Sequence, residues 1–303
     1  DGLNWTSTSS DVMPGYGTKK VIWDGSRFVA ITGNTVFALA NGTDWTQIAT
    51  IKNGGSSLSL QSIAWDGSRY LVAGVGSANG SPSGGIIGTS ANGVTWTFLS
   101  ADPSTYYTHI MGDAVSAMAL RGDGMIKRWD GSTWVLENSG LTGELVGLIK
   151  NGTASVAFSR AGMVSTSATA GIWQTGDRRV SQPLRSITSG NGVLVAGGEE
   201  AILRSTDGRN WTRETPVGLR GPFVDPVWTG SRFLILGESC IYASTDGTGW
   251  TAWGDTWDYN VSVNCFALFG GKTVLAGNGF WIEDGTVYRK GEEASGVSVS
   301  LLI

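Results

Sequence analysis

Two stretches of the sequence decide the fold: Ser205-Thr206-Asp207-Gly208-Arg209-Asn210-Trp211 and Ser244-Thr245-Asp246-Gly247-Thr248-Gly249-Trp250. Each contains an acid, a glycine, two variable residues and a tryptophan. The same five-residue mark, with Asp or Asn first, also runs over Asp1 to Trp5, Asn41 to Trp45, Asn92 to Trp96 and Asp130 to Trp134. Degenerate copies stand at Ala170 to Trp173 and Asp284 to Tyr288, and the final aromatics of the eight copies are 40, 51, 38, 39, 38, 39 and 38 residues apart. The chain is therefore an array of repeats.

A second signature lies between the marks. It reads Trp23-Asp24-Gly25-Ser26-Arg27-Phe28, Trp65-Asp66-Gly67-Ser68-Arg69-Tyr70 and Trp228-Thr229-Gly230-Ser231-Arg232-Phe233. Each copy separates two short apolar runs, as a tight hairpin turn does. The first repeat then predicts four antiparallel strands, Lys20 to Trp23, Phe28 to Thr32, Val36 to Ala40 and Trp45 to Ala49.

A period near 40 residues with four strands in each unit is typical of a β-propeller. Seven sets of inner strands are counted, so we expect an all-β, seven-bladed β-propeller over residues 1–293. The leading strand, Asp1 to Thr6, has no inner strands before it. We expect it to join the last blade or to be left over from a preceding domain, and we expect the sequence to be part of a longer or processed protein.

The marks resemble the Asp-box, or bacterial neuraminidase repeat, found in sialidases, sortilin-type receptors and many viral and bacterial propellers. The stretches at Asp207 and Asp246 carry the resemblance, in a variant that is one residue shorter than the usual box. The resemblance implies a propeller fold and does not imply an activity. We interpret the box as structural: its side-chain oxygen accepts backbone N–H groups of its own turn, and its Trp packs on the sheet.

Composition excludes several functions. With 21 Lys and Arg against 25 Asp and Glu, the net charge is −4, which argues against nucleic acid as a partner. No apolar run is long enough to span a membrane, so we expect no membrane insertion. One His and two Cys are too few for the usual His/Cys metal cage, which leaves a carboxylate site for calcium as the open alternative, and we expect neither a metal nor a cofactor. Cys240 and Cys265 are expected to be free thiols rather than a disulfide.

Function on a repeat scaffold lies in its variable loops. The connection between the sixth and seventh blades combines aromatic rings with carboxylates and an amide, which is the composition of a sugar-binding surface. The ligand-binding residues that we predict there are Trp253, Asp255, Trp257, Asp258, Tyr259 and Asn260. We place Tyr16 of the leader and Arg220 of the loop from Pro216 to Pro226 beside them, and we expect no catalytic residue. An alternative reading is that Trp253 and Trp257 fill the groove between blades. The insertion from Gly76 to Gly85 is expected to be a tolerated loop.

Three functions stay open. The first is a non-enzymatic module that binds a cell-surface glycan or receptor, as in a phage tail or a secreted bacterial surface protein. The second is a glycoside hydrolase that uses two carboxylates among Asp11, Asp225, Asp255 and Asp258. The third is a protein-binding scaffold. His109 is expected to be a hydrogen-bonded filler on an innermost strand.

The apolar and alternating end of the sequence, residues 294–303, is predicted to be a strand that docks on a neighbouring domain or another structural subunit. Low charge and abundant Ser, Thr and Gly favour an extracellular or virion-surface location.

Overall fold

The computed structural model describes residues 5–9, 18–40, 44–52, 58–76, 84–103, 105–112, 116–142, 144–176, 183–214, 218–219, 221–238, 240–253, 262–269, 272–278, 280–283, 286–289 and 297–302. For residues 5–9 and 99–101, and for those after 253, it describes the backbone alone. Every regular element in these ranges is a β-strand, which confirms the all-β class. The described ranges contain no helix that is long and apolar enough to cross a membrane.

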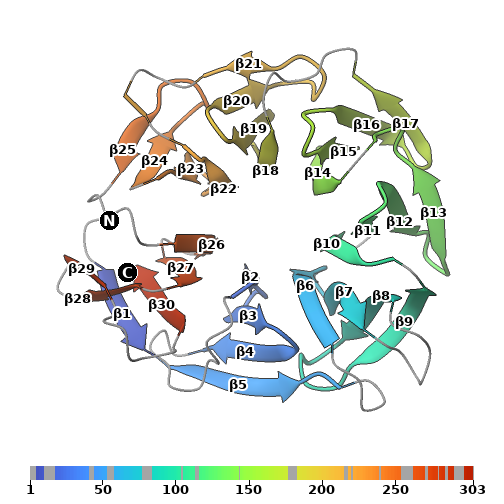
Figure 1. Ribbon diagram of the computed structural model, residues 1–303, viewed down its shortest axis with the longest axis horizontal. Helices are drawn as coiled ribbons and strands as arrows, with labels where there is room; N and C mark the ends of the chain where they lie inside the picture. The colour runs from blue at the N-terminus through green and yellow to red at the C-terminus, as the bar shows by residue number, and fades with distance from the viewer. Residues whose placement is uncertain are drawn as a thin grey trace. The chain divides into compact units, whose positions relative to one another are not determined.

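The chain divides into two units. Unit 1 comprises residues 1–121, 128–134 and 260–303, and unit 2 comprises residues 122–127 and 135–259. Unit 1 contains two regular blades, each an antiparallel sheet of four consecutive strands (Figure 1). The strands of the first are β2 (Lys20–Trp23), β3 (Phe28–Thr32), β4 (Thr35–Leu39) and β5 (Trp45–Thr50). Those of the second are β6 (Leu58–Trp65), β7 (Tyr70–Gly76), β8 (Gly84–Ser90) and β9 (Thr97–Pro103).

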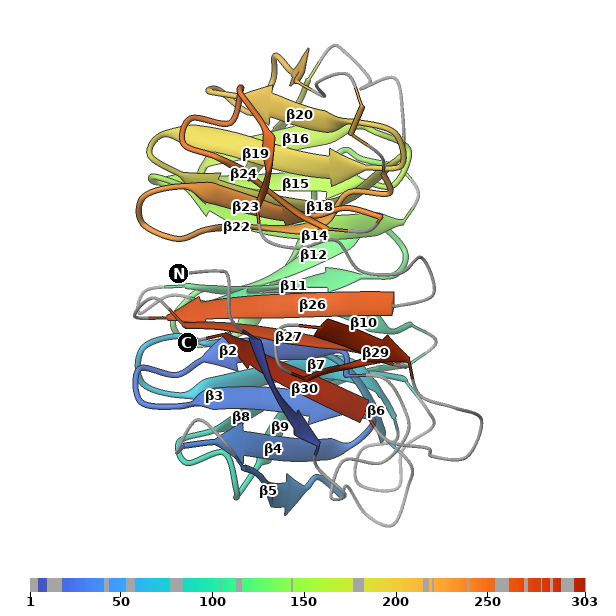
Figure 2. The same cartoon turned by 90° about the vertical axis from the view of Figure 1, so that its left-hand side faces the viewer.

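Unit 2 contains three more regular blades, whose strands are seen from the side in Figure 2. The strands of the first are β14 (Leu145–Asn151), β15 (Ala154–Ser159), β16 (Val164–Thr169) and β17 (Ile172–Thr175). Those of the second are β18 (Leu184–Gly190), β19 (Val193–Gly198), β20 (Ile202–Ser205) and β21 (Thr212–Arg213). Those of the third are β22 (Val224–Trp228), β23 (Phe233–Leu236), β24 (Ile241–Ser244) and β25 (Thr251–Trp253). One further blade has its residues divided between the two units. Its strands are β10 (Tyr107–Gly112), β11 (Ala117–Arg121), β12 (Met125–Trp129) and β13 (Trp134–Asn138).

The prediction of seven blades is wrong, because the described residues form six blades of four consecutive strands. The last part of the sequence does not repeat the pattern. Strands β26 (Ser262–Phe269) and β27 (Lys272–Asn278) pair with each other, but β28 (Phe280–Glu283) and β29 (Thr286–Arg289) form a separate hairpin. The place that β28 would take beside β27 is held by β30 (Val297–Leu302), with β1 (Trp5–Ser9) beyond it.

Strand length gives a physical reason for this replacement. The register of β27 with β30 extends from Thr273 opposite Leu302 to Asn278 opposite Val297, whereas β28 has only four residues to offer. The longer ladder makes more backbone hydrogen bonds. Strand β1 pairs with β30 from Trp5 opposite Leu302 to Ser9 opposite Ser298, so the leading strand does join the other end of the sequence. The docking of residues 294–303 on a partner stays a prediction.

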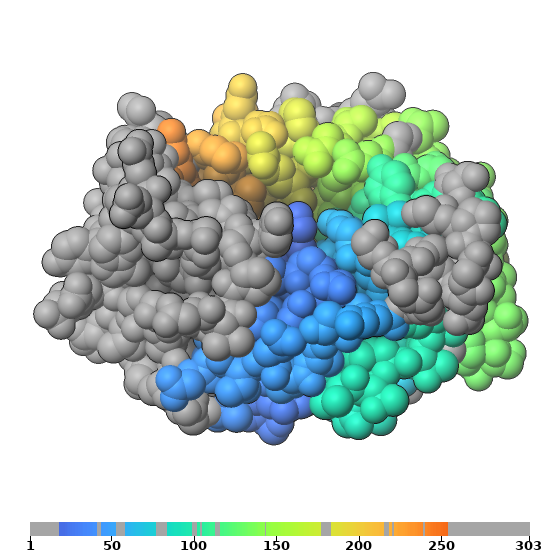
Figure 3. Space-filling view, turned by 60° about the horizontal axis from the view of Figure 1, so that its bottom comes forward, coloured from blue at the N-terminus to red at the C-terminus, as the bar shows by residue number. Residues whose placement is uncertain are grey.

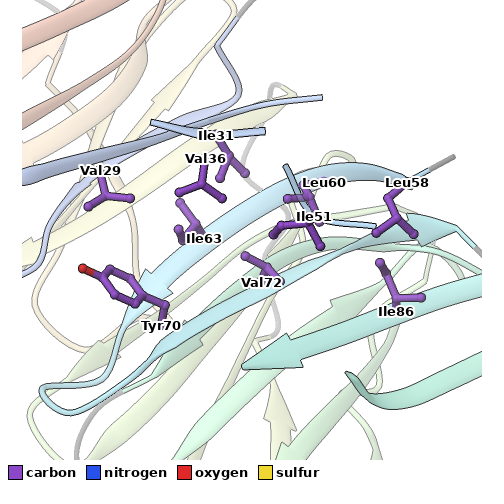
Figure 4. Packing of buried hydrophobic residues seen from close by; sticks show 10 residues of the cluster. All are labelled: Val29, Ile31, Val36, Ile51, Leu58, Leu60, Ile63, Tyr70, Val72 and Ile86. Carbon is purple, nitrogen blue, oxygen red and sulfur yellow. The ribbon is translucent and has the colours of Figure 1, made fainter. Parts of the chain in front are cut away.

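The core of unit 1 lies between its two regular blades. Apolar side chains from β3 and β4 face those from β6, β7 and β8, as Figure 4 shows. Val29, Ile31, Val36, Leu60 and Val72 are all fully buried there. Figure 3 shows the surfaces of the same two blades, blue and cyan, lying next to each other. The near-continuous apolar runs of the inner strands are thus explained by burial on both faces.

Unit 2 is packed by two similar clusters, one between the blades β14–β17 and β18–β21 and one between β18–β21 and β22–β25. The blades approach so closely that glycine is required at some contacts. A Cβ atom on Gly190 would lie 2.2 Å from the indole of Trp228 in the neighbouring blade. Glycine therefore sets the spacing between these sheets.

The second sequence signature forms the hairpin turns that we predicted. Asp24 accepts hydrogen bonds at Oδ1 from the N–H groups of Ser26 and Arg27, and its own N–H bonds to the carbonyl of Arg27 at 3.1 Å. Gly25 adopts a φ of +99°, a backbone conformation that a residue with a side chain rarely takes. Trp23 and Phe28, on either side of the turn, pack edge to face at 5.0 Å between ring centroids.

The mark from Asp130 to Trp134 is a hairpin turn and not a box. Asp130 accepts the N–H groups of Ser132 and Thr133, as Asp24 does in its own turn, and Gly131 has a φ of +105°. Its Trp134 packs against Trp129 at 5.8 Å, as the aromatic pairs of the other hairpin turns do. The Trp directly before the acid decides this conformation, because it supplies the second ring of the pair.

Candidate functional site

The three boxes whose side chains are described are structural, as predicted. Asp207 Oδ1 accepts the N–H groups of Arg209 and Asn210 at 2.8 Å each, and Trp211 Nε1 donates to the carbonyl of Gly208 at 3.2 Å. Ser205, two residues before the acid, accepts the N–H of Gly208 at 2.9 Å. The corresponding hydrogen bonds recur in the boxes of Asn92 and Asp246.

The carboxylate of Asp207 is occupied by hydrogen bonds within its own turn. Burial raises the pKa of Asp207, but the backbone and side-chain hydrogen bonds from Asn210, with those from Arg209 and Ser205, outweigh it and lower the pKa to about 2. No group of His, Cys, Asp or Glu that could hold a metal occurs in the part of the sequence that the structure describes. The opposite end of the sheets is therefore the better candidate for a functional site.

At that end, the first strand of each regular blade of unit 2 begins with a β-bulge. In unit 2 the register shifts between Leu145 and Gly147 in β14, between Leu184 and Ser186 in β18, and between Val224 and Val227 in β22. A bulge inserts an unpaired residue and redirects its side chain. In β18 the inserted residue is Arg185, and in β22 the insertion includes Asp225, whose φ is +48°.

Backbone hydrogen bonds hold the neighbouring blades together at this end. Leu184 donates its N–H to the carbonyl of Arg160 at 3.2 Å, and Phe223 donates to that of Gly198 at 2.9 Å. The N–H of Asp225 bonds to Ser186 Oγ at 2.7 Å. Figures 1 and 2 show the first strands β14, β18 and β22 of these three blades. The backbone that carries the side chains at this end is therefore held in place by hydrogen bonds between blades.

Four of those side chains form two ion pairs in neighbouring blades, which we call the charged edge: Glu144 with Arg160, and Arg185 with Glu199. Arg160 Nε donates to Glu144 Oε2 at 2.8 Å. Arg185 makes a bidentate pair with Glu199 through Nε and Nη2, at 2.9 Å each. Between 36% and 51% of each of these side chains is exposed, so the charges are available to a partner.

Arg160 is paired with Glu144 and is also influenced by the charge of Glu199. The hydrogen bond to Glu144 raises the pKa of Arg160 above its ordinary value, against the effect of burial, and the charges of Glu144 and Glu199 raise it further. Glu199 belongs to the next blade. The permanently protonated Arg160 is therefore influenced by carboxylates of two neighbouring blades.

Most of the predicted ligand-binding residues lie outside the described residues. These are Tyr16, Arg220, Asp255, Trp257, Asp258, Tyr259 and Asn260. Trp253 is described: it is half-buried at the end of β25, opposite Ile241 of β24. The sugar-binding surface that we predicted around it stays a prediction.

The structure also places several other residues that the sequence singled out. Phe223, in the loop from Pro216 to Pro226, is fully buried in the core of unit 2, while Asp225, a candidate carboxylate of the hydrolase alternative, is half-buried. Cys240 is a buried free thiol, as expected. His109 lies on β10, the first strand of its blade, as predicted, but its side chain is exposed, so it does not fill the interior. The bulge between Tyr107 and His109 explains this, because it shifts the alternation of inward and outward residues.

Sequence reasoning missed the charged edge. Its residues are separated in the sequence and belong to no motif. One signal was present: Arg160 and Glu199 both directly follow the buried run of a second strand, at equivalent places of successive repeats. A comparison of the successive repeats at the residue after the second strand would have found these two charged residues.

The comparisons with known proteins support the fold. No family model matches the sequence, and no curated protein matches it. Solved structures do match over nearly their whole length. A structure of YCF48 bound to D1 peptide is 16% identical with a TM-score of 0.69, and the match covers 96% of each protein. The fold is that of a β-propeller.

Two further structures show the same likeness. YCF48 from Cyanidioschyzon merolae is 14% identical with a TM-score of 0.68, and the match covers 98% of each protein. Virginiamycin B lyase from Staphylococcus aureus is 12% identical with a TM-score of 0.71 and covers 99% of each. These identities show the propeller fold alone, because one fold carries both binding proteins and an enzyme.

Proposed function

We propose that this propeller is a binding scaffold that holds a peptide segment of a partner protein on the charged edge of unit 2. The observation that supports this most directly is that its two ion pairs, Glu144 with Arg160 and Arg185 with Glu199, are exposed on a backbone fixed between blades. Arginine is enriched in protein interfaces because its planar fork recognises carboxylates and carbonyls at low entropic cost. A propeller that binds a peptide, YCF48 with D1 peptide, lends further support.

The charged edge is better suited to a peptide than to a sugar. Sugar sites rely on flat aromatic faces, and within the described residues of unit 2 no aromatic side chain is exposed. The glycan hypothesis, with a phage-tail or cell-surface role and an extracellular or virion-surface location, now rests on the loop after Trp253. The hydrolase alternative needs two carboxylates across a cleft, and of its four candidates only Asp225 is described.

A selection of displayed random peptides on the immobilised full-length protein tests the proposal, with a glycan array run in parallel. We expect the selection to enrich peptides. Their affinity should fall about tenfold or more when Arg160 and Arg185 are both replaced by Ala, the loss typical of central interface arginines.

The matched control is Arg232→Ala. Arg232 is also an exposed arginine of unit 2, but it lies in the turn between β22 and β23, at the other end of its sheet. This variant should bind as the unaltered protein does, and melting temperatures should confirm that both variants are folded. Enrichment of no peptide would contradict the proposal, and glycan binding that depends on Trp253 would favour the other hypothesis.

A further inference from the structure

The two arginines of the charged edge are held in different ways. Glu144 engages Arg160 at Nε alone, and the two terminal amino groups of Arg160 donate no hydrogen bond to any described residue. Glu199 engages Arg185 from the side, through both Nε and Nη2. No described residue therefore occupies the outer edge of the Arg160 guanidinium, formed by Nη1 and Nη2. Arg185 keeps the same outer edge, but the side chain of Arg160 is the more exposed of the two, at 51% against 38%.

This open edge has a defined direction. The backbone N–H of Arg160 bonds to the carbonyl of Glu144 at 2.9 Å, and its carbonyl accepts the N–H of Leu184. The side chain is tied at Nε to the same Glu144. Because the backbone is held and the inner nitrogen is hydrogen-bonded, less side-chain entropy is lost when a ligand binds the outer edge than for an unpaired arginine.

A planar pair of N–H donors fits a carboxylate in a bidentate arrangement. The terminal carboxylate of a peptide is a poorer candidate than an acidic side chain, because terminal carboxylates are usually captured by several free backbone N–H groups. Here the N–H groups of Arg160, Leu184, Glu199 and Phe223 all bond to backbone carbonyls. The chemistry favours an acidic side chain on an otherwise extended peptide.

We propose that the Nη1–Nη2 edge of Arg160 is a specificity site that binds an Asp or Glu side chain of the partner peptide. The inference rests on the proposed function and adds the chemical class of the ligand. Glu144 acts as a positioning residue that holds Nε of Arg160. The Arg185–Glu199 pair presents one positive and one negative charge on the next blade, where they would contact the peptide residue next to the acidic one.

The test measures fluorescence anisotropy of a short Gly-Ser peptide that carries glutamates and is amidated at its C-terminus, added to the full-length protein. The same peptide with glutamine in place of glutamate is its control. We expect the glutamate peptide to bind at least about tenfold more tightly, the difference expected for one charge-assisted hydrogen-bonded pair. Arg160→Gln should abolish this preference. Arg160→Lys should lose most of it, because lysine keeps the charge but not the fork.

Arg232→Gln removes the same charge elsewhere and should keep the preference. An equal loss in Arg160→Gln and Arg232→Gln would overturn the inference, because it would indicate unspecific attraction. Tight binding that requires a free C-terminal carboxylate would also overturn it. If random peptides are enriched by the protein without an excess of acids, and bind independently of Arg160, this inference fails while the proposed function stands. If no peptide is enriched, the proposed function itself fails.

Discussion

Tyr70 of β7 donates its phenol hydrogen bond to Asp24 Oδ2 in the turn of the preceding blade. The carboxylate of Asp24 is almost fully buried, with 4% of its side chain exposed. Arg27 completes the contact: its Nε lies 3.1 Å from Asp24 Oδ2, and its Nη2 reaches the Tyr70 hydroxyl at 3.3 Å and the carbonyl of Asn92 at 3.4 Å. Hydrogen bonds thus join the hairpin turn of one blade to strand β7 and to the Asn92 box of the next blade.

Tyr70→Phe should lower the free energy of unfolding by about 1–2 kcal/mol, because it removes a hydrogen bond to a buried carboxylate and fills the same volume. Chemical denaturation measures this. The control is Tyr106→Phe, in which the ring is 45% exposed, and it should change stability by less than about 0.5 kcal/mol. Equal stability of the two variants would show that the Tyr70–Asp24 contact does not stabilise the blade interface.

The carboxylate of Asp207 should make the free energy of unfolding depend on pH in the acidic range. Its pKa in the folded protein is about 2, below the ordinary value of 3.8. The stabilisation from its ionised form is complete above the unfolded pKa and is lost as the pH falls from about 4 to about 2. We expect a contribution of at most about 1 kcal/mol, because the group is exposed and screened by solvent. Unfolding by denaturant at a series of pH values measures it.

Asp207→Asn is the matched variant, because Asn92 makes the same turn bonds at 2.9 Å in its own box. It should keep most of the stability at pH 7 and lose part of the acid dependence. Asp207→Ala should cost about 1 kcal/mol at pH 7, since the turn loses its acceptor. An Asn variant as unstable as the Ala variant would contradict the role assigned to the side-chain oxygen.

The spacing of blades in unit 2 should be sensitive to one methyl group. Gly190→Ala places a Cβ where the indole of Trp228 now lies, and overpacking of this kind costs about 1–3 kcal/mol. Gly249→Ala, where a Cβ would meet nothing within 4 Å, is the control and should be nearly neutral. Thermal denaturation compares the two; a Gly190 variant as stable as the control would mean that the blades can move apart without loss.

Local signals made the regular blades predictable. The turn Trp23 to Phe28 carries both its aromatic pair and its acid within six residues, and the four strands around it follow the predicted ranges closely. The end of the sequence was not predictable in this way. The pairing of β27 with β30 in place of β28 is a competition between two non-local ladders, and strand propensity does not rank them.

The candidate site was harder to predict for a related reason. Loop composition favours the aromatics from Trp253 onward, which are close together in the sequence. The charged edge instead joins Glu144, Arg160, Arg185 and Glu199 across two blades, and only the stacking of repeats brings them together. The bulge that redirects Arg185 has no signature in the sequence.

The location of a bound peptide tests the central claim most directly. A peptide selected on the full-length protein, with a photo-reactive residue built in, can be cross-linked and the attachment sites mapped by mass spectrometry. We predict attachment beside the charged edge, at residues 144, 160 and 183–186 and at 198–200. Attachment at the box end of the same blades, around Asp207, Arg232 and Asp246, would contradict the account.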